Sequence, residues 1–185
     1  MPYLVAAVVL VGLLCLVDLV LTFGVIRRLR QHAELLSRRM DRDERILLGA
    51  GERVADFAAT TFEGEAVSRA GLGGDTLVGF FSPSCAACAE RLPDFVDRAA
   101  RHDGGRARVL AVVVGDASET ATQRDLLTPV ARVAVEPREG PLATAFAVQG
   151  FPAFALVDAA GSVLASGLTV EDLRATGERY DPARV

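Results

Sequence analysis

The most apolar stretch of the chain lies at its start. Residues 3–26 are almost wholly apolar, with Asp18 as the single charged residue. At about 1.5 Å per residue a helix of this length crosses the hydrocarbon core of a bilayer. The stretch lacks a basic region ahead of it and a small-residue cleavage site before Arg27, as a removable signal would have. The pattern therefore predicts an uncleaved transmembrane anchor at residues 1–27.

Two polar or reactive residues within this anchor have open interpretations. Asp18 is either a polar contact to a partner helix or an acid tolerated near one side of the bilayer, and the second is the simpler hypothesis. Cys15 is interpreted as a small apolar side chain, because Leu13 and Leu14 precede it where a lipoprotein signal would have small residues.

The next stretch, residues 28–50, is charged, with apolar residues interspersed. It predicts a juxtamembrane helical stalk that ends near Gly49 and Gly51. A short coiled coil is the alternative, but the heptad pattern does not persist. The remaining chain divides into one domain at residues 51–180 and a tail at 181–185.

Within that domain, short apolar runs alternate with helical patterns. Residues 76–81 and 108–115 are continuous apolar runs, typical of strands buried on both faces of a sheet. The other expected strands are a hairpin at residues 57–67 turning at Glu63-Gly64, and segments 132–135, 153–157 and 163–165. The expected helices are 86–102, 119–127, 141–146 and 170–178, the last capped by Thr169. This alternation predicts an α/β layered domain with a central sheet flanked by helices.

The composition limits the possible functions of the chain but does not identify one. The chain has 185 residues, which suits an anchor and a single domain. Its net charge of −4 gives no basic surface for nucleic acid. It contains three cysteines, of which two are close together in the sequence.

Those two cysteines, Cys85 and Cys88, lie one helical turn apart directly after the strand at residues 76–81. Unpaired N–H groups and the dipole at a helix start favour the thiolate form of the first cysteine. This placement predicts a redox-active disulfide, in which Cys85 attacks and Cys88 resolves. A zinc site of four cysteines is excluded because only Cys15 remains, and His32 and His102 lack ligand spacing to the pair.

Further motifs make the resemblance to a known family specific. The strand, the Cys85-x-x-Cys88 pair, Pro93 inside the following helix and Gly150-x-Pro152 before a later strand resemble the thioredoxin-like superfamily. More narrowly, the hairpin ahead of the core resembles membrane-anchored disulfide reductases of the TlpA and ResA kind. The lead-in Ser82-Pro83-Ser84 is similar to that of MauD, the thiol-disulfide protein of methylamine utilisation.

This resemblance implies several roles. Pro152 is expected to be a cis proline that faces the cysteines, and Pro93 is expected to kink the active-site helix as structural support. A substrate groove is expected along Ser82, Pro83, Ser84, Phe151 and Pro152, with an extended substrate segment lying beside Phe151. No cofactor is expected beyond the Cys85–Cys88 disulfide itself.

Four positions depart from the family pattern. Ser84 replaces the usual tryptophan, and Ala86-Ala87 replaces the proline-containing pair between the cysteines. Gly79 stands where thioredoxins keep a buried acid that helps to deprotonate the second cysteine. Phe151 is bulky, so it either narrows the groove or gives it an apolar anchor.

The resulting hypothesis is a membrane-tethered thiol–disulfide oxidoreductase that exchanges electrons with protein substrates. Its expected partners are a protein thiol or disulfide and a membrane or thioredoxin-type electron donor. One alternative is a peroxide reductase of the AhpC/TSA type, although Ser82 occupies the position of its threonine. Another is a metal or haem-pathway chaperone that binds through Cys85 and Cys88.

The location of the domain is open between two arguments. Five arginines follow the apolar segment and none precedes it, so the positive-inside rule places the domain in the cytoplasm. The resemblance implies an extracytoplasmic domain on a single-pass cell-membrane anchor. We expect the extracytoplasmic location, because the resemblance rests on many matched positions.

Overall fold

The computed structural model describes residues 45–116 and 118–173 of the chain. Those from Arg45 onward belong to one compact unit. Its strands are β1 (Ala58–Thr60), β2 (Ala66–Ser68), β3 (Thr76–Phe81), β4 (Val109–Val114), β5 (Arg132–Glu136), β6 (Ala153–Val157) and β7 (Val163–Gly167). Its helices are α2 (Ala86–Ala100), α3 (Ala121–Leu127) and α4 (Pro141–Ala145), with short 3₁₀ turns η1 (Arg69–Gly71) and η2 (Gly105–Arg108).

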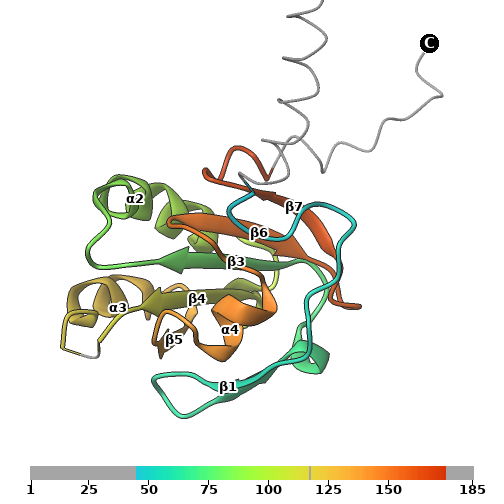
Figure 1. The fold of residues 1–185 in the computed structure, drawn as a ribbon, viewed down its shortest axis with the longest axis horizontal. Coiled ribbons are helices and arrows are strands. Elements are labelled where there is room, and N and C mark those ends of the chain that lie inside the picture. Colours follow the sequence, from blue (N-terminus) through green and yellow to red (C-terminus); the bar gives the residue numbers. More distant parts are fainter. Residues whose placement is uncertain (1–44, 117, 174–185) are drawn as a thin grey trace, which may run out of the picture. The chain divides into compact units, whose positions relative to one another are not determined.

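Five strands form a mixed sheet in the order β5-β4-β3-β6-β7 (Figure 1). The β3–β4 and β4–β5 pairs are parallel, whereas β3–β6 and β6–β7 are antiparallel. Every residue of β3 and of β4 is buried, which confirms the prediction from their continuous apolar runs. The predicted hairpin is also present as a separate two-stranded sheet, β1–β2.

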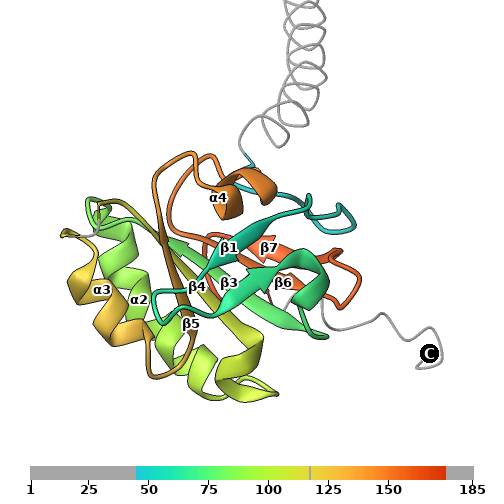
Figure 2. The same ribbon diagram turned by 90° about the horizontal axis from the view of Figure 1, so that it is seen from below.

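Helices cover both faces of this sheet (Figure 2). Alternate residues of β3 and β4 enter two different core clusters, because successive side chains of a strand point to opposite faces. Val78 and Phe80 join the cluster that contains Leu142 of α4. Leu77 and Phe81 join the cluster that contains the buried side of α2 and Leu127 of α3. The fold is thus the expected thioredoxin-like layered α/β arrangement.

A glycine lets α2 pack closely on the sheet. A Cβ added at Gly79 of β3 would lie 2.6 Å from a ring carbon of Phe95 and 3.0 Å from one of Phe81. Phe95 is fully buried, and its ring centroid lies 5.1 Å from that of Phe81. The place of the buried acid of thioredoxins is therefore filled here by an aromatic ring.

The structure differs from the prediction at residues 45–50. This segment was expected to end a helical stalk, but its backbone is irregular and Leu47 is buried in the core. The Gln149 N–H donates to the Ile46 carbonyl at 2.7 Å, and the Leu48 N–H donates to the Phe146 carbonyl at 3.0 Å. Because these backbone groups and apolar side chains are engaged by the domain, the folded unit begins at Arg45 rather than at Gly51.

Several predicted segments fall outside the described residues. They are the anchor at residues 1–27, the stalk up to residue 44, and the end of the last helix with the tail. Residues 170–173 form a turn rather than the start of a regular helix. In this turn the Thr169 hydroxyl oxygen accepts the Asp172 N–H at 3.3 Å, and the Asp172 carboxylate accepts the Thr169 N–H at 2.9 Å. Among residues 45–116 and 118–173, no helix has the length and apolarity needed to cross a membrane.

Candidate active site

Cys85 lies at the start of α2, as the sequence predicted. It is the N-cap residue, with extended backbone angles of φ −99° and ψ 110°, and its Sγ atom accepts the Cys88 N–H at 3.1 Å. The Cys85 N–H in turn donates to the Ser82 carbonyl oxygen at 3.2 Å. The turn after β3 thus brings the sulfur to a backbone N–H in the first turn of α2, which the sulfur shares with the Cys85 carbonyl oxygen at 3.1 Å.

The two thiols have different environments. Both cysteines are free, and Cys85 is partly exposed whereas Cys88 is fully buried. The pKa of the Cys88 thiol is raised from 9.0 to about 12, first by burial and then by its hydrogen bond with Cys85, which together outweigh a lowering by the Ser82 backbone. Cys88 is therefore a protonated thiol at neutral pH, and Cys85 is the more exposed of the two sulfurs.

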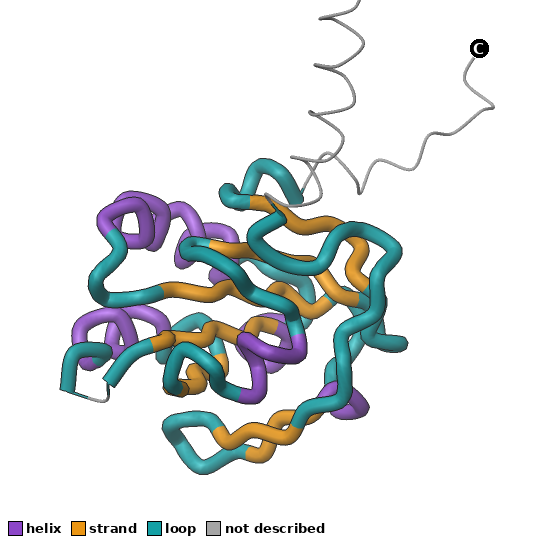
Figure 3. Tube along the Cα trace, in the orientation of Figure 1, coloured by secondary structure: helices purple, strands orange, loops and turns teal. Residues whose placement is uncertain are grey.

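The Phe151-Pro152 segment, directly before β6, forms the second part of the site. The peptide bond between these two residues is cis, as the resemblance implied. The Cys85 thiol donates to the Phe151 carbonyl oxygen at 3.3 Å. This contact follows from the antiparallel register of β3 and β6, in which Phe80 lies opposite Ala153. Figure 3 shows the loops before α2 and before β6 at the same edge of the sheet.

The other predicted site residues divide by exposure. Ser84 is exposed, and Pro83 and Phe151 are partly buried, and of these three Phe151 contacts the sulfur through its carbonyl oxygen. Ser82 differs from the prediction, because its side chain is buried with a hydroxyl 3.3 Å from that of Ser84, so it supports the loop rather than lining a groove. Pro152 is also buried, so its ring packs inside the domain rather than facing solvent.

Pro93 lies inside α2 on its exposed side, as expected. It has no N–H to donate, so it leaves one backbone carbonyl of the preceding turn without its helical partner. The helix nevertheless continues to Ala100.

Two residues that the sequence did not single out also shape the site. Gln123 of α3 is buried, and its side-chain amide donates to the Ser82 carbonyl at 3.2 Å. The Glu136 carboxylate accepts the N–H groups of Leu142 and Ala143 at 3.0 and 2.6 Å, which ties α4 to the end of β5. The local sequence does not mark these residues, because each hydrogen bond can be recognised only when the position of its partner in the fold is known.

Burial raises the pKa of the Glu136 carboxyl from its ordinary value of 4.5, and its two backbone hydrogen bonds offset only part of that rise. A Cβ at Gly140 would lie 2.4 Å from the carboxyl carbon of Glu136, so this turn has no room for a larger residue. Glu136 therefore holds the short helix that leads into the Phe151-Pro152 segment.

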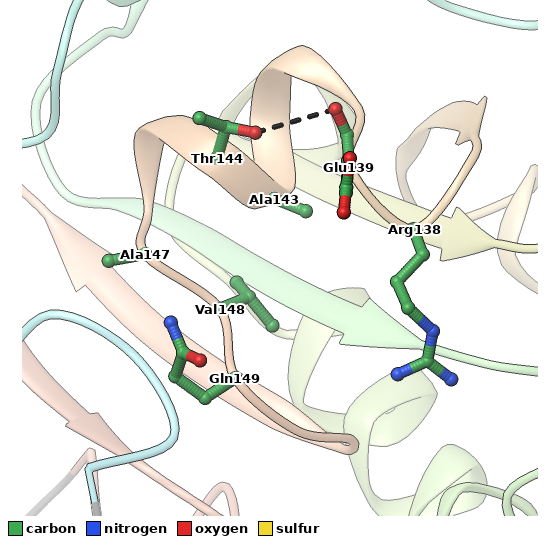
Figure 4. A pocket seen from close by; sticks show the side chains of 7 residues that line it. All are labelled: Arg138, Glu139, Ala143, Thr144, Ala147, Val148 and Gln149. Atoms are coloured by element: carbon green, nitrogen blue, oxygen red, sulfur yellow. Dashed lines mark hydrogen bonds between the residues drawn. The ribbon is translucent and has the colours of Figure 1, made fainter. Parts of the chain in front are cut away.

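A cavity of about 480 Å³ opens beside the chain that leads into the Phe151-Pro152 segment (Figure 4). It is bordered by α4 and the loops on either side of it, through Arg138, Glu139, Ala143, Thr144, Ala147, Val148 and Gln149. The Arg138 guanidinium carbon lies 5.8 Å from the centroid of the Phe151 ring. Among the described residues, no cluster of three or more histidine, cysteine or acidic side chains forms a metal site.

Comparison with known proteins identifies a family. Residues 50–166 match the AhpC/TSA family. No curated protein matches the chain at a significant level.

Solved structures share the fold. The thioredoxin domain of a thiol-disulfide oxidoreductase from Bacteroides vulgatus is 19% identical, with a TM-score of 0.57 over 71% of this chain and 96% of that one. A protein assigned as the thiol:disulfide interchange protein DsbE from Chlorobium tepidum is 25% identical, with a TM-score of 0.51 over 65% and 86%. A thiol:disulfide interchange protein from Bacteroides sp. is 18% identical, with a TM-score of 0.57 over 72% and 90%.

Proposed function

The chain belongs to the AhpC/TSA family, and from that premise we propose that it is a thiol–disulfide oxidoreductase that acts on protein substrates through Cys85 and Cys88. The observation that carries the proposal is the asymmetry of the pair. A partly exposed sulfur accepts a helix N–H, and one turn deeper lies a buried thiol whose pKa is about 12. Disulfide exchange needs this combination of one accessible nucleophile and one protected partner.

The reaction proceeds in two exchanges. The Cys85 thiolate attacks one sulfur of a substrate disulfide; that bond breaks, and the other substrate sulfur leaves as a thiolate that takes up a proton. Cys88 then loses its proton and attacks Cys85, which releases the second substrate thiol and forms the Cys85–Cys88 disulfide. Two electrons and two protons pass to the substrate. A dithiol donor of the thioredoxin type, or a membrane donor, returns them.

Peroxide reduction is the competing reaction within the same family. Its expected threonine position is occupied by Ser82, whose buried hydroxyl lies beside Ser84. Cys88, one turn from Cys85, supplies the resolving thiol that disulfide exchange uses. These features favour a disulfide substrate over a peroxide.

Insulin-disulfide reduction tests the proposal directly. The wild-type chain is expected to reduce insulin in the presence of dithiothreitol, and Cys85→Ser is expected to remove that activity. Cys88→Ser is expected to accumulate a mixed disulfide, because the second exchange is blocked. Peroxide consumption without insulin reduction would reverse the assignment in favour of the competing reaction.

We also propose that residues 1–27 anchor the protein in the cell membrane, with the redox domain outside the cytoplasm. The support is the apolar sequence of residues 3–26 and the resemblance to anchored reductases. Whole cells labelled with a membrane-impermeant maleimide test this, using Cys15→Ser so that only Cys85 and Cys88 report. Labelling of intact cells, with or without prior mild reduction, is expected; labelling only after lysis would place the domain in the cytoplasm.

A further inference from the structure

The cavity beside α4 is close to the reactive sulfur without including it. Its wall at Val148 and Gln149 is the chain that leads into Phe151, and Phe151 contacts Cys85 through its carbonyl oxygen. Arg138 lies across the cavity from Gln149 (Figure 4). Phe151 thus connects the wall of the cavity to the sulfur of Cys85.

Arg138 is available to bind a ligand. Its side chain is exposed, and its guanidinium carbon lies 5.8 Å from the Phe151 ring centroid, so the ring supports the cation from one side. Within the part of the chain that the structure describes, Arg138 forms no ion pair. A guanidinium held in this way presents paired N–H donors that match a carboxylate.

Strand geometry places a particular substrate residue here. An extended segment rises about 3.3 Å per residue, and side chains two positions apart point to the same face. A substrate cysteine that faces Cys85 lies beside Phe151, and Gln149, two residues earlier in the chain, lines the cavity. A side chain about two positions from that cysteine is therefore within reach of the cavity and of Arg138 in its wall.

We propose that this cavity is a specificity subsite in which Arg138 binds the carboxylate of an aspartate or glutamate two residues from the substrate's reactive cysteine. The inference rests on the proposed disulfide exchange and names a substrate class for it. Glu139 lines the same cavity and carries the opposite charge. It therefore opposes binding of an acidic side chain, so the two residues have opposite expected effects.

Synthetic peptides with one cysteine, each linked by a disulfide to a chromogenic thiol, provide the test. The peptides carry glutamate, glutamine or lysine two positions before or after the cysteine. Reduction by the full-length chain is followed as kcat/KM at low ionic strength. The quantity of interest is the glutamate-to-glutamine rate ratio.

The wild-type ratio is expected to be about two to five at one of the two positions, as for a solvent-exposed ion pair. Arg138→Gln is expected to bring that ratio to about one, Glu139→Gln to increase it, and added salt to decrease it. Arg53→Gln is the matched control, because it makes the same change in net charge at the other end of β6. Arg53 forms a backbone β-bridge with Ser162 there, and its substitution is expected to leave the ratio unchanged.

A wild-type ratio of one, or a ratio that survives Arg138→Gln, would overturn the subsite. Faster reduction of the lysine peptide would also overturn it, since Glu139 would then be the binding group. No reduction of any peptide would instead contradict the proposed disulfide exchange, so failure of the subsite and failure of the activity give different results.

Discussion

The Sγ atom of Cys85 lies 3.3 Å from the carbonyl oxygen of Phe151, a residue 66 positions later in the chain. The contact joins the loop after β3 to the loop before β6, and the antiparallel pairing of these two strands produces it. The reactive sulfur is therefore held by the helix start on one side and by the cis peptide segment on the other. The first loop supplies the sulfur, and the second supplies the carbonyl oxygen that the sulfur contacts.

The difference between the two thiols predicts selective alkylation. With a pKa of about 12, Cys88 is a thiolate in only about one molecule in ten thousand at pH 8. Iodoacetamide applied to the reduced Cys15→Ser chain is expected to label Cys85 and leave Cys88 unmodified, as read by mass spectrometry. The same treatment in urea should label both. Equal labelling of both cysteines in the native protein would contradict the assignment of Cys88 as the protected thiol.

The close approach of α2 to β3 predicts a large effect of a small substitution. Gly79→Ala puts a methyl group 2.6 Å from a Phe95 ring carbon, and overpacking of a rigid core costs about 1 to 3 kcal/mol. Urea unfolding is expected to show this loss. The double variant Gly79→Ala with Phe95→Leu should lose less than the sum of the two single variants, because the smaller side chain makes room. Additive losses would mean that the two residues do not compete for this space.

The hydrogen bond from Gln123 to the Ser82 carbonyl predicts a graded series at position 123. Gln123→Leu removes one buried hydrogen bond and is expected to lower the free energy of unfolding by about 1 kcal/mol. Gln123→Glu places an oxygen against the carbonyl and buries a charge, so a loss of more than about 2 kcal/mol is expected. Thr122→Ala, on the exposed side of the same helix, is the control. Glutamate tolerated as well as leucine would refute the contact.

Glu136 predicts a pH-dependent contribution to stability. Its folded-state pKa is raised above 4.5, first because the carboxyl is buried. Its contribution is therefore fully present below pH 4.5 and is lost as the pH rises through the folded-state pKa. As the pH is lowered from about 7 towards 4.5, the free energy of unfolding of the wild type should rise relative to that of Glu136→Gln. Glu139→Gln, an exposed neighbour, should not show this slope.

The packing of residues 45–50 predicts that Leu47 stabilises the domain. Leu47 is 5% exposed, and truncation of such a side chain costs about 2 to 5 kcal/mol. Leu47→Ala in the full chain is expected to lose stability in this range, as measured by chemical denaturation, whereas Arg45→Ala should have little effect. A neutral Leu47→Ala would support the helical stalk that the sequence pattern indicated.

The sequence predicted the elements whose physical cause is local. The apolar runs of β3 and β4 and the Glu63-Gly64 turn each carry their own signal, and so does the cysteine spacing at the start of α2. Gln123 and Arg138 carry none, because their roles depend on partners 41 and 13 residues away, which only the folded chain brings near. The segment at residues 45–50 was misassigned for a related reason: its apolar residues fit a helical pattern, and the pattern does not say which surface covers them.

The hydrogen bonds of Ile46 and Leu48 have a mechanical consequence. The first connects to Gln149 and the second to Phe146, at the two ends of the short stretch that follows α4. Tension applied to the chain at Arg45 would therefore load this stretch before it reached the strands of the sheet. A force on the N-terminal side of the domain is transmitted first to the residues that position Phe151, so the geometry around Cys85 is coupled to how the domain is held.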